Sequence, residues 1–130
     1  MLFRSIGLEN VWNNLWVKPD FAAAFIRSFK VATVKAYLDL GNHERYAPAQ
    51  KWVHTLSDQI VKMHIKDFKV NRDAKNSGGF VRIGDGSIDW REVRRAIEAV
   101  GYNGWISIES SGWTDAEHSA IMDRFFAGTL

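Results

Sequence analysis

The sequence predicts an α/β fold in which four short parallel strands alternate with four helices. Four runs containing apolar residues have the length of strands, and segments with helical periodicity separate them (residues 6–9, 33–39, 59–64 and 105–109). Each run ends at an acidic residue or a histidine. Because strands that alternate with helices pair in parallel through right-handed crossovers, we expect all four strand ends at one edge of one sheet.

The first two strands are separated by one predicted helix. The first strand, residues 6–9, is followed by Pro19, which the first turn of a helix tolerates. Residues 21–27 are rich in helix-forming residues with one apolar side. The second strand, residues 33–39, is ended by Gly41.

The second helix begins at Pro48 and leads to the third strand. Three apolar residues of this helix share one face, namely Trp52, Val53 and Leu56. The third strand covers residues 59–64, and we expect it to continue to Asp67. A long polar loop, residues 69–87, is predicted to follow.

The third helix begins after Ser87 or Asp89 and has a regularly spaced apolar side. Gly101 is well placed to end it, because glycine adopts the left-handed conformation common after helices. The fourth strand covers residues 105–109. The last helix begins at residues 114–117, Thr-Asp-Ala-Glu, which match a capping box.

Composition indicates a soluble globular protein with one domain, residues 1–130. Apolar residues make up 46% of the chain, and the net charge of +2 favours neither a nucleic acid nor a membrane as partner. There is no cysteine, which excludes disulfides and thiolate metal sites. Residues 1–5 lack the apolar stretch of a signal peptide, and no apolar run approaches the ~20 residues that span a bilayer. We therefore expect a cytoplasmic protein.

The number of units predicts half of a closed barrel. A (β/α)8 barrel has eight strand–helix units and about 250 residues, whereas this chain has four units in 130 residues. We interpret the chain as the C-terminal half of a TIM barrel, strands five to eight. Such a half leaves two parallel edge strands unpaired, and unpaired edges promote association. We therefore expect either a homodimer or a missing N-terminal half.

The strand ends predict a metal-dependent active site. Glu9, Asp39, His64 and Glu109 would converge at one edge, where active sites of β/α barrels lie. Three carboxylates and one imidazole favour Mn²⁺, with Mg²⁺, Co²⁺ and Zn²⁺ as alternatives. A 2-hydroxy ketone could chelate such an ion, which would stabilise the enediolate formed when the α-proton is lost. Glu9 and Glu109, on opposite sides of the substrate, would remove and return the proton.

Several motifs, in order along the chain, resemble the C-terminal half of the sugar phosphate isomerase/epimerase family, whose members are xylose-isomerase-like barrels. They are the segments at residues 9–14 (ENVWNN), 39–42 (DLGN), 64–67 (HIKD), 84–90 (GDGSIDW) and 101–105 (GYNGW). The resemblance implies an isomerase of carbohydrate metabolism with Glu9, Asp39, His64 and Glu109 as metal ligands. It also implies that the two glutamates are the catalytic acid and base.

The resemblance has two departures. The four N-terminal units that normally complete the pocket are absent. Ketose 3-epimerases carry a histidine where this chain has Asn42, followed here by His43, so the sequence is more similar to the pentulose-phosphate epimerase branch. We predict that Asn42, His43, Lys66 and Trp12 contact the substrate.

A phosphate site and two other functions remain alternatives. Residues 84–86, Gly-Asp-Gly, follow the seventh barrel strand and either bind phosphate through loop amides or form a plain turn; Arg82 is a poorer candidate. Apurinic-site endonucleases share this barrel, but their multi-zinc site uses several more histidines than the single strand-end histidine here. The other alternative is that the chain is a non-catalytic fragment, which keeps the metal ligands but lacks half of the substrate pocket.

Overall fold

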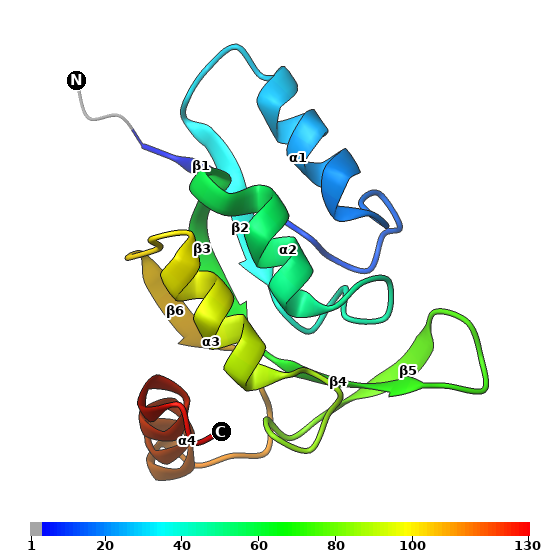
Figure 1. Cartoon of the computed structure of the whole chain (residues 1–130), viewed down its shortest axis with the longest axis vertical. Coiled ribbons are helices and arrows are strands. Elements are labelled where there is room, and N and C mark those ends of the chain that lie inside the picture. The colour runs from blue at the N-terminus through cyan, green and yellow to red at the C-terminus, as the bar shows by residue number, and fades with distance from the viewer. Residues whose placement is uncertain (1–3) are drawn as a thin grey trace.

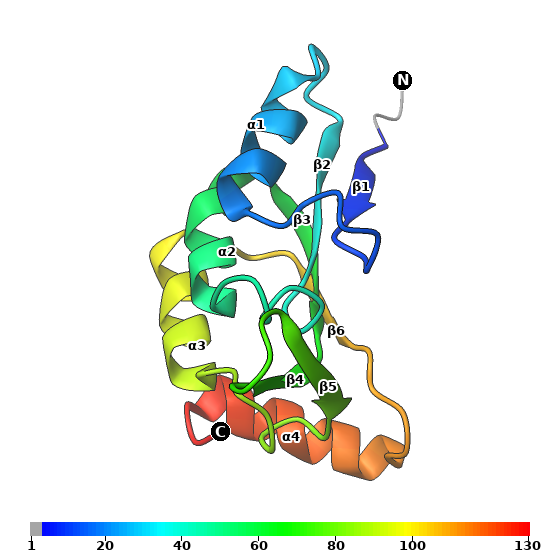
Figure 2. The same cartoon turned by 90° about the vertical axis from the view of Figure 1, so that its right-hand side faces the viewer.

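The computed structural model describes residues 4–130, and it confirms the predicted α/β fold. Four parallel strands form one sheet in the order β1-β2-β3-β6. Figures 1 and 2 show helices α1, α2 and α3 side by side on one face of this sheet, and within residues 4–130 no helix covers the other face. Residues 1–3, part of the stretch considered for a signal peptide, lie outside the described residues. Within residues 4–130, no helix is long and apolar enough to cross a membrane.

The observed elements agree closely with the predicted units. The strands of the main sheet are β1 (Ile6–Glu9), β2 (Val34–Asp39), β3 (Ile60–Ile65) and β6 (Trp105–Ile108). The helices are α1 (Pro19–Ser28), α2 (Ala49–Leu56), α3 (Trp90–Ala99) and α4 (Asp115–Ala127), with a short 3₁₀ turn η1 (Ser57–Gln59) before β3.

Side chains from the helix-covered face of the sheet and from the helices form one core. Its buried members include Ile26 of α1, Trp52 and Val53 of α2, Val93 of α3, and Leu38 and Met63 of the sheet. Burying each large apolar side chain contributes about 1.5–3 kcal/mol of hydrophobic free energy. The opposite face of the sheet therefore remains free to present polar side chains.

The predicted helix ends are confirmed by their capping contacts. The side chain of Asp89 accepts a hydrogen bond from the backbone N–H of Glu92 at the start of α3. Thr114 and Glu117 form the predicted capping box of α4. Gly101, just after α3, has a φ of 66°, the left-handed conformation expected of it.

A bulge in β3 decides which residues of this strand face the core. Ala36 of β2 pairs with Ile60, but Tyr37 pairs with Lys62, so β3 has one additional residue at this point. Strand side chains alternate between faces, and a slip of one residue exchanges them. Without the bulge Asp39 would lie opposite Met63, whereas in the structure it lies opposite His64.

The predicted polar loop after the third strand is wrong in part, because it contains an antiparallel hairpin of β4 (Asp67–Asn71) and β5 (Ser77–Val81). The expected continuation of the third strand to Asp67 is also wrong: β3 ends at Ile65, and Asp67 begins the hairpin. Strand β4 does alternate polar and apolar residues, but the pattern is short and stands in a segment rich in polar and glycine residues, so it was interpreted as a loop.

Asp67 fixes the loop that returns from the hairpin to α3. Its carboxylate is 1% exposed and accepts hydrogen bonds from the backbone N–H groups of Gly84 (2.8 Å) and Gly86 (3.2 Å) and from Trp90 Nε1 (3.1 Å). A Cβ atom at Gly86 would lie 1.9 Å from Asp67 Oδ1. Only glycine lets the loop approach the carboxylate this closely.

Replacing Gly86 by alanine should therefore destabilise the protein. The added methyl would separate a buried carboxylate from its donors, so we expect Gly86→Ala to lower the free energy of unfolding by about 1–3 kcal/mol in urea titrations. Gly79→Ala is the matched control, because nothing lies within 4 Å of a Cβ there. Equal unfolding midpoints for the two variants would contradict this role of Gly86.

Candidate metal centre

The ends of the four parallel strands bring four side chains together. Glu9 and Asp39 end β1 and β2, His64 lies near the end of β3, and Glu109 directly follows β6. One ligand atom from each lies within 4.8 Å of those from the others. Nδ1 of His64 is 3.5 Å from an oxygen of Glu9, 3.7 Å from one of Asp39 and 3.8 Å from one of Glu109. The predicted convergence is thus present.

Asp39 is held rigidly and is nearly inaccessible. Its Oδ1 accepts hydrogen bonds from the backbone N–H groups of Gly41 (2.9 Å) and Asn42 (2.7 Å). The side chain of Asn10 bonds both the N–H and the carbonyl of Asp39, each at 2.7 Å. Burial raises the pKa of Asp39 to about 7. Its Oδ2 faces the other ligands and has no hydrogen-bond partner.

His64 presents an unpaired nitrogen to the carboxylates. Its Nε2 contacts the hydroxyl of Tyr37, and its buried Nδ1 has no hydrogen-bond partner. Buried polar atoms without partners are rare in folded proteins. Here two of them, Nδ1 of His64 and Oδ2 of Asp39, are directed to the same point, so the cluster fits a divalent cation that would satisfy both.

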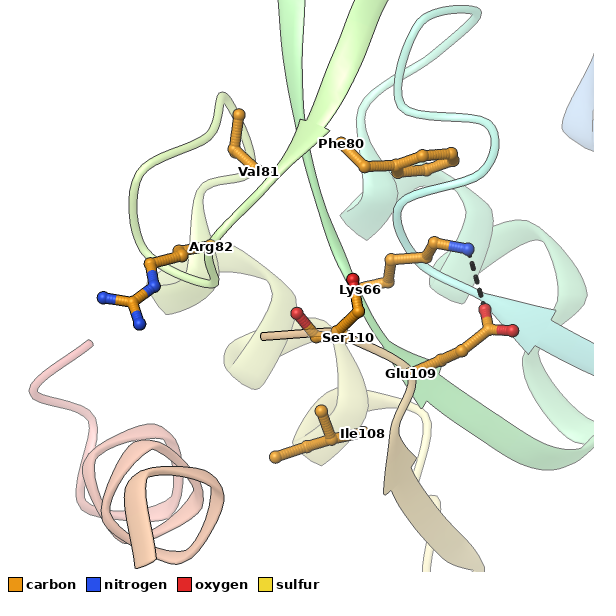
Figure 3. Close-up of a pocket in the computed structure, with 8 residues that line it drawn as sticks. Lys66, Phe80, Val81, Arg82, Ile108, Glu109 and Ser110 are labelled. Atoms are coloured by element: carbon orange, nitrogen blue, oxygen red, sulfur yellow. Dashed lines mark hydrogen bonds and ion pairs between the residues drawn. The ribbon is translucent and has the colours of Figure 1, made fainter. Parts of the chain in front are cut away.

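Glu109 forms the accessible side of the cluster. Figure 3 shows Lys66 and Glu109 pointing toward each other, and their ion pair is 2.8 Å long. The hydrogen bond from Lys66 lowers the pKa of Glu109, which keeps this carboxyl ionised. The Lys66 ammonium also lies 4.2 Å from the centre of the Phe80 ring. Lys66, Phe80 and Glu109 all line a pocket of about 690 Å³ between the hairpin and the segment after β6.

The predicted substrate-contacting residues fall into two groups. Trp12 is partly exposed, and its ring packs against Phe80 at 5.0 Å and beneath the guanidinium of Arg45 at 4.0 Å. Lys66 lines the pocket beside Glu109, and Trp12 is connected to that pocket through its contact with Phe80. Asn42 and His43 are instead buried.

Asn42 and His43 have contacts that support the loop after β2. The backbone carbonyl of Asn42 accepts a hydrogen bond of 2.9 Å from Trp12 Nε1. His43 packs against Trp52, and its Nε2 donates to the carbonyl of Val11 at 3.2 Å. Burial lowers the pKa of His43 to about 4, so the ring is neutral at pH 7.

The two alternatives for residues 84–86 can be compared directly. The N–H groups of Gly84 and Gly86 donate to Asp67, which favours the plain turn over a phosphate site. Arg82 points away from Lys66 in Figure 3 and lies 3.6 Å from Glu117, so it remains a poorer candidate.

Sequence reasoning did not find three residues at the site, namely Asn10, Tyr37 and Phe80. Tyr37 precedes Asp39 by two residues and so shares its face of the strand, a signal that the sequence does contain. Asn10 follows Glu9 directly. Phe80 had no such signal, because it lies in the hairpin that was predicted to be a loop.

The fold and cluster define a class: a parallel β/α half-barrel with acidic and imidazole side chains gathered at the carboxyl ends of its strands. The family model described as "xylose isomerase-like TIM barrel" matches residues 5–123. The chain belongs to this family.

Individual relatives agree with this assignment. An uncharacterized protein of Methanocaldococcus jannaschii is 27% identical over 120 residues, which are 88% of this chain and 39% of that protein. A D-tagatose 3-epimerase-like protein has a similar structure (TM-score 0.76, 23% identity), with 96% of this chain and 48% of that chain covered. A xylose isomerase-like TIM barrel protein from Mycobacterium smegmatis, solved with magnesium, gives a TM-score of 0.72 at 22% identity, covering 97% and 45%. The chain thus spans less than half the length of these proteins.

The buried carboxyl of Asp39 makes the stability of the metal-free chain depend on pH. Burial raises its pKa from 3.8 to about 7, so the folded state holds a proton that the unfolded chain releases across this window. Its contribution to stability is present below this window and lost as the pH rises through it. With a chelator present, we expect Asp39→Asn to be more stable than the wild type at pH 8, by about 1–3 kcal/mol, and the difference to shrink near pH 4.

Urea titrations at several pH values measure this difference. Asp123→Asn, on the exposed side of α4, is the control and should follow the wild type. Parallel pH profiles for wild type and Asp39→Asn would show that burial does not disfavour the ionised carboxylate.

Proposed function

We propose that this chain is the metal-binding half of a sugar isomerase or 3-epimerase, with Glu9, Asp39, His64 and Glu109 as the ligands of one divalent cation. The observation that carries this proposal is the pair of unpartnered, buried ligand atoms on Asp39 and His64, which face each other at 3.7 Å beside two further carboxylates. The names of the structural neighbours, a 3-epimerase-like protein and a magnesium complex, support the same reaction class and a divalent metal.

The donor set favours a hard cation. Three carboxylates and one imidazole suit Mn²⁺ best among the common divalent ions, with Mg²⁺, Co²⁺ and Zn²⁺ as alternatives. Four protein ligands leave positions on a six-coordinate ion for the two oxygens of a 2-hydroxy ketone. When bound, the cation supplies positive charge that stabilises the enediolate of the substrate.

The two glutamates are the proposed acid and base. Asp39 is 1% exposed, so it cannot reach a carbon-bound proton of a substrate. The side chains of Glu9 and Glu109 are 30% and 48% exposed, and they belong to opposite edge strands of the sheet. The ion pair with Lys66 keeps Glu109 ionised, which is the state needed to accept a proton.

The pocket beside Glu109 is the proposed place for the rest of the sugar. Lys66 lines this pocket and would contact a hydroxyl or a phosphate there; Phe80 also lines it, and the ring of Trp12 packs against Phe80. A sugar or sugar phosphate fits within about 690 Å³. Asn42 and His43 would act here through the loop that holds Asp39 and Trp12.

The alternatives are less well supported. Within residues 4–130 the cluster contains a single histidine, which disfavours the multi-zinc hydrolase. A non-catalytic fragment would bind the cation without exchanging substrate protons. A proton-exchange experiment therefore distinguishes it from the proposed enzyme.

We also propose that residues 1–130 form a single domain that is completed by a second (βα)4 unit, either a second copy or another segment of a longer chain. Strands β1 and β6 are the two open edges of the sheet. Both carry exposed apolar side chains, Ile6 (58%) and Trp105 (82%). Pairing of these edges would close a barrel and cover the sheet face that has no helices.

Proton exchange in D₂O tests the proposed reaction. With Mn²⁺ at saturation, we expect the protein to incorporate deuterium beside the carbonyl of a pentulose or its 5-phosphate. Glu109→Gln removes one proton-transfer group and should slow this exchange by about 10²–10⁴-fold while Mn²⁺ still binds. Glu98→Gln, an exposed residue of α3, is the control.

Unchanged exchange in Glu109→Gln, or exchange without metal, would contradict the proposal. Mn²⁺ binding with no exchange in the wild type would support the non-catalytic alternative.

Sedimentation of the chain tests the second unit. A second copy predicts a species of twice the 14.8 kDa chain mass, and Trp105→Lys should shift it toward the monomer by placing a charge on the open edge. Glu98→Lys on α3 is the control. A stable monomer with the wild-type sequence would rule out the second copy and leave another segment as the missing unit.

A further inference from the structure

Tyr37 lies beside the cluster but is not one of its four ligands. It precedes Asp39 by two residues on β2, so both side chains project from the helix-free face of the sheet. Its ring centre is 4.5 Å from that of His64, and its hydroxyl contacts His64 Nε2. Strand β2 thus supplies both the proposed ligand Asp39 and Tyr37, whose hydroxyl contacts the proposed ligand His64.

The position of the Tyr37 ring is restricted by its neighbours. A Cβ atom at Gly7, on the adjacent strand β1, would lie only 3.1 Å from Tyr37 Cβ, so the glycine leaves the space that the tyrosine occupies. The Lys62 ammonium lies 4.7 Å from the centre of the tyrosine ring. The hydroxyl is therefore presented to His64 from a packed ring.

The contact couples the Tyr37 hydroxyl to the position of the His64 proton: Nε2 donates to the hydroxyl oxygen in one tautomer and accepts from the hydroxyl in the other. A neutral imidazole has one N–H, and a hydrogen bond at one nitrogen sets the state of the other. If Nε2 donates its proton to the Tyr37 oxygen, Nδ1 is left with a free lone pair. That lone pair faces oxygens of Glu9, Asp39 and Glu109 at 3.5–3.8 Å, so in this tautomer a cation between the four atoms would bind all of them.

We infer that Tyr37 is a positioning residue that holds the proton of His64 on Nε2 and so keeps Nδ1 free to coordinate the cation. This inference rests on the proposed metal site and adds a residue that acts through His64 without touching the cation or the substrate. Partners of this kind, which bind the second nitrogen of a metal-ligating histidine, typically change metal affinity by about 10–100-fold.

Tyr37→Phe removes the hydroxyl and keeps the ring that packs on His64. By titration calorimetry we expect this variant to bind Mn²⁺ about 10–100-fold more weakly than the wild type. Tyr46→Phe is the matched control: its hydroxyl donates to Asn14 Oδ1 at 2.7 Å, away from the ligands, so its affinity should be unchanged.

The ¹⁵N chemical shifts of His64 in the metal-free chain provide a readout that a merely structural role would not move. We expect the wild type to show a protonated Nε2 and an unprotonated Nδ1, and Tyr37→Phe to show a mixture of both tautomers. This measurement on the wild type needs no variant, so it decides the inference even if Tyr37→Phe fails to fold.

A wild-type proton on Nδ1 would overturn the inference, because Tyr37 would then donate to Nε2 and the nitrogen facing the carboxylates would be blocked. Wild-type Mn²⁺ affinity in Tyr37→Phe would overturn it as well. Failure of the wild type to bind Mn²⁺ would instead refute the proposed function, while the nitrogen shifts would still report on the Tyr37 contact.

Discussion

Three carboxylates packed around one imidazole, all with ligand atoms within 4.8 Å, are the constraint on which the rest of this structure depends. Like charges this close disfavour one another, and burial of Asp39 adds a desolvation penalty. The protein offsets the charge from its own groups: two backbone N–H groups donate to Asp39, and the Lys66 ammonium pairs with Glu109. This compensation leaves Oδ2 of Asp39 and Nδ1 of His64 unpaired, and a cation would bind them together with the carboxylates of Glu9 and Glu109.

The fold keeps these charged groups in place by separating its polar and apolar faces. Helices cover one face of the sheet and bury its apolar residues, so the strand ends can place polar side chains on the other. The bulge in β3 sets this separation of faces at the ligand cluster, because it puts Met63 in the core and His64 opposite Asp39. Beyond the strand ends, Asp67 anchors the loop that follows the β4–β5 hairpin, and Phe80 of that hairpin borders the open side of the cluster.

The sequence predicted the parts of the site that depend on strand order, and missed those that depend on local irregularity. Parallel pairing brings the ends of successive strands to one edge, so Glu9, Asp39, His64 and Glu109 could all be found from the ends of apolar runs. The bulge was not predicted, although β3 carries a weak sign of it: its buried residues Ile60, Met63 and Ile65 are three and then two positions apart, which interrupts the strict alternation of a strand. The hydrogen bonds from Gly84 and Gly86 to Asp67 could not be predicted either, because they depend on the β4–β5 hairpin, which was interpreted as a loop.

The most direct test of a shared cation is anomalous diffraction from a crystal grown with Mn²⁺. We expect a single peak bonded, at about 2.1–2.2 Å, to oxygens of Glu9, Asp39 and Glu109 and to Nδ1 of His64. No peak among these residues, or a peak bonded to only one of them, would contradict the claim that the four strand ends form one metal site.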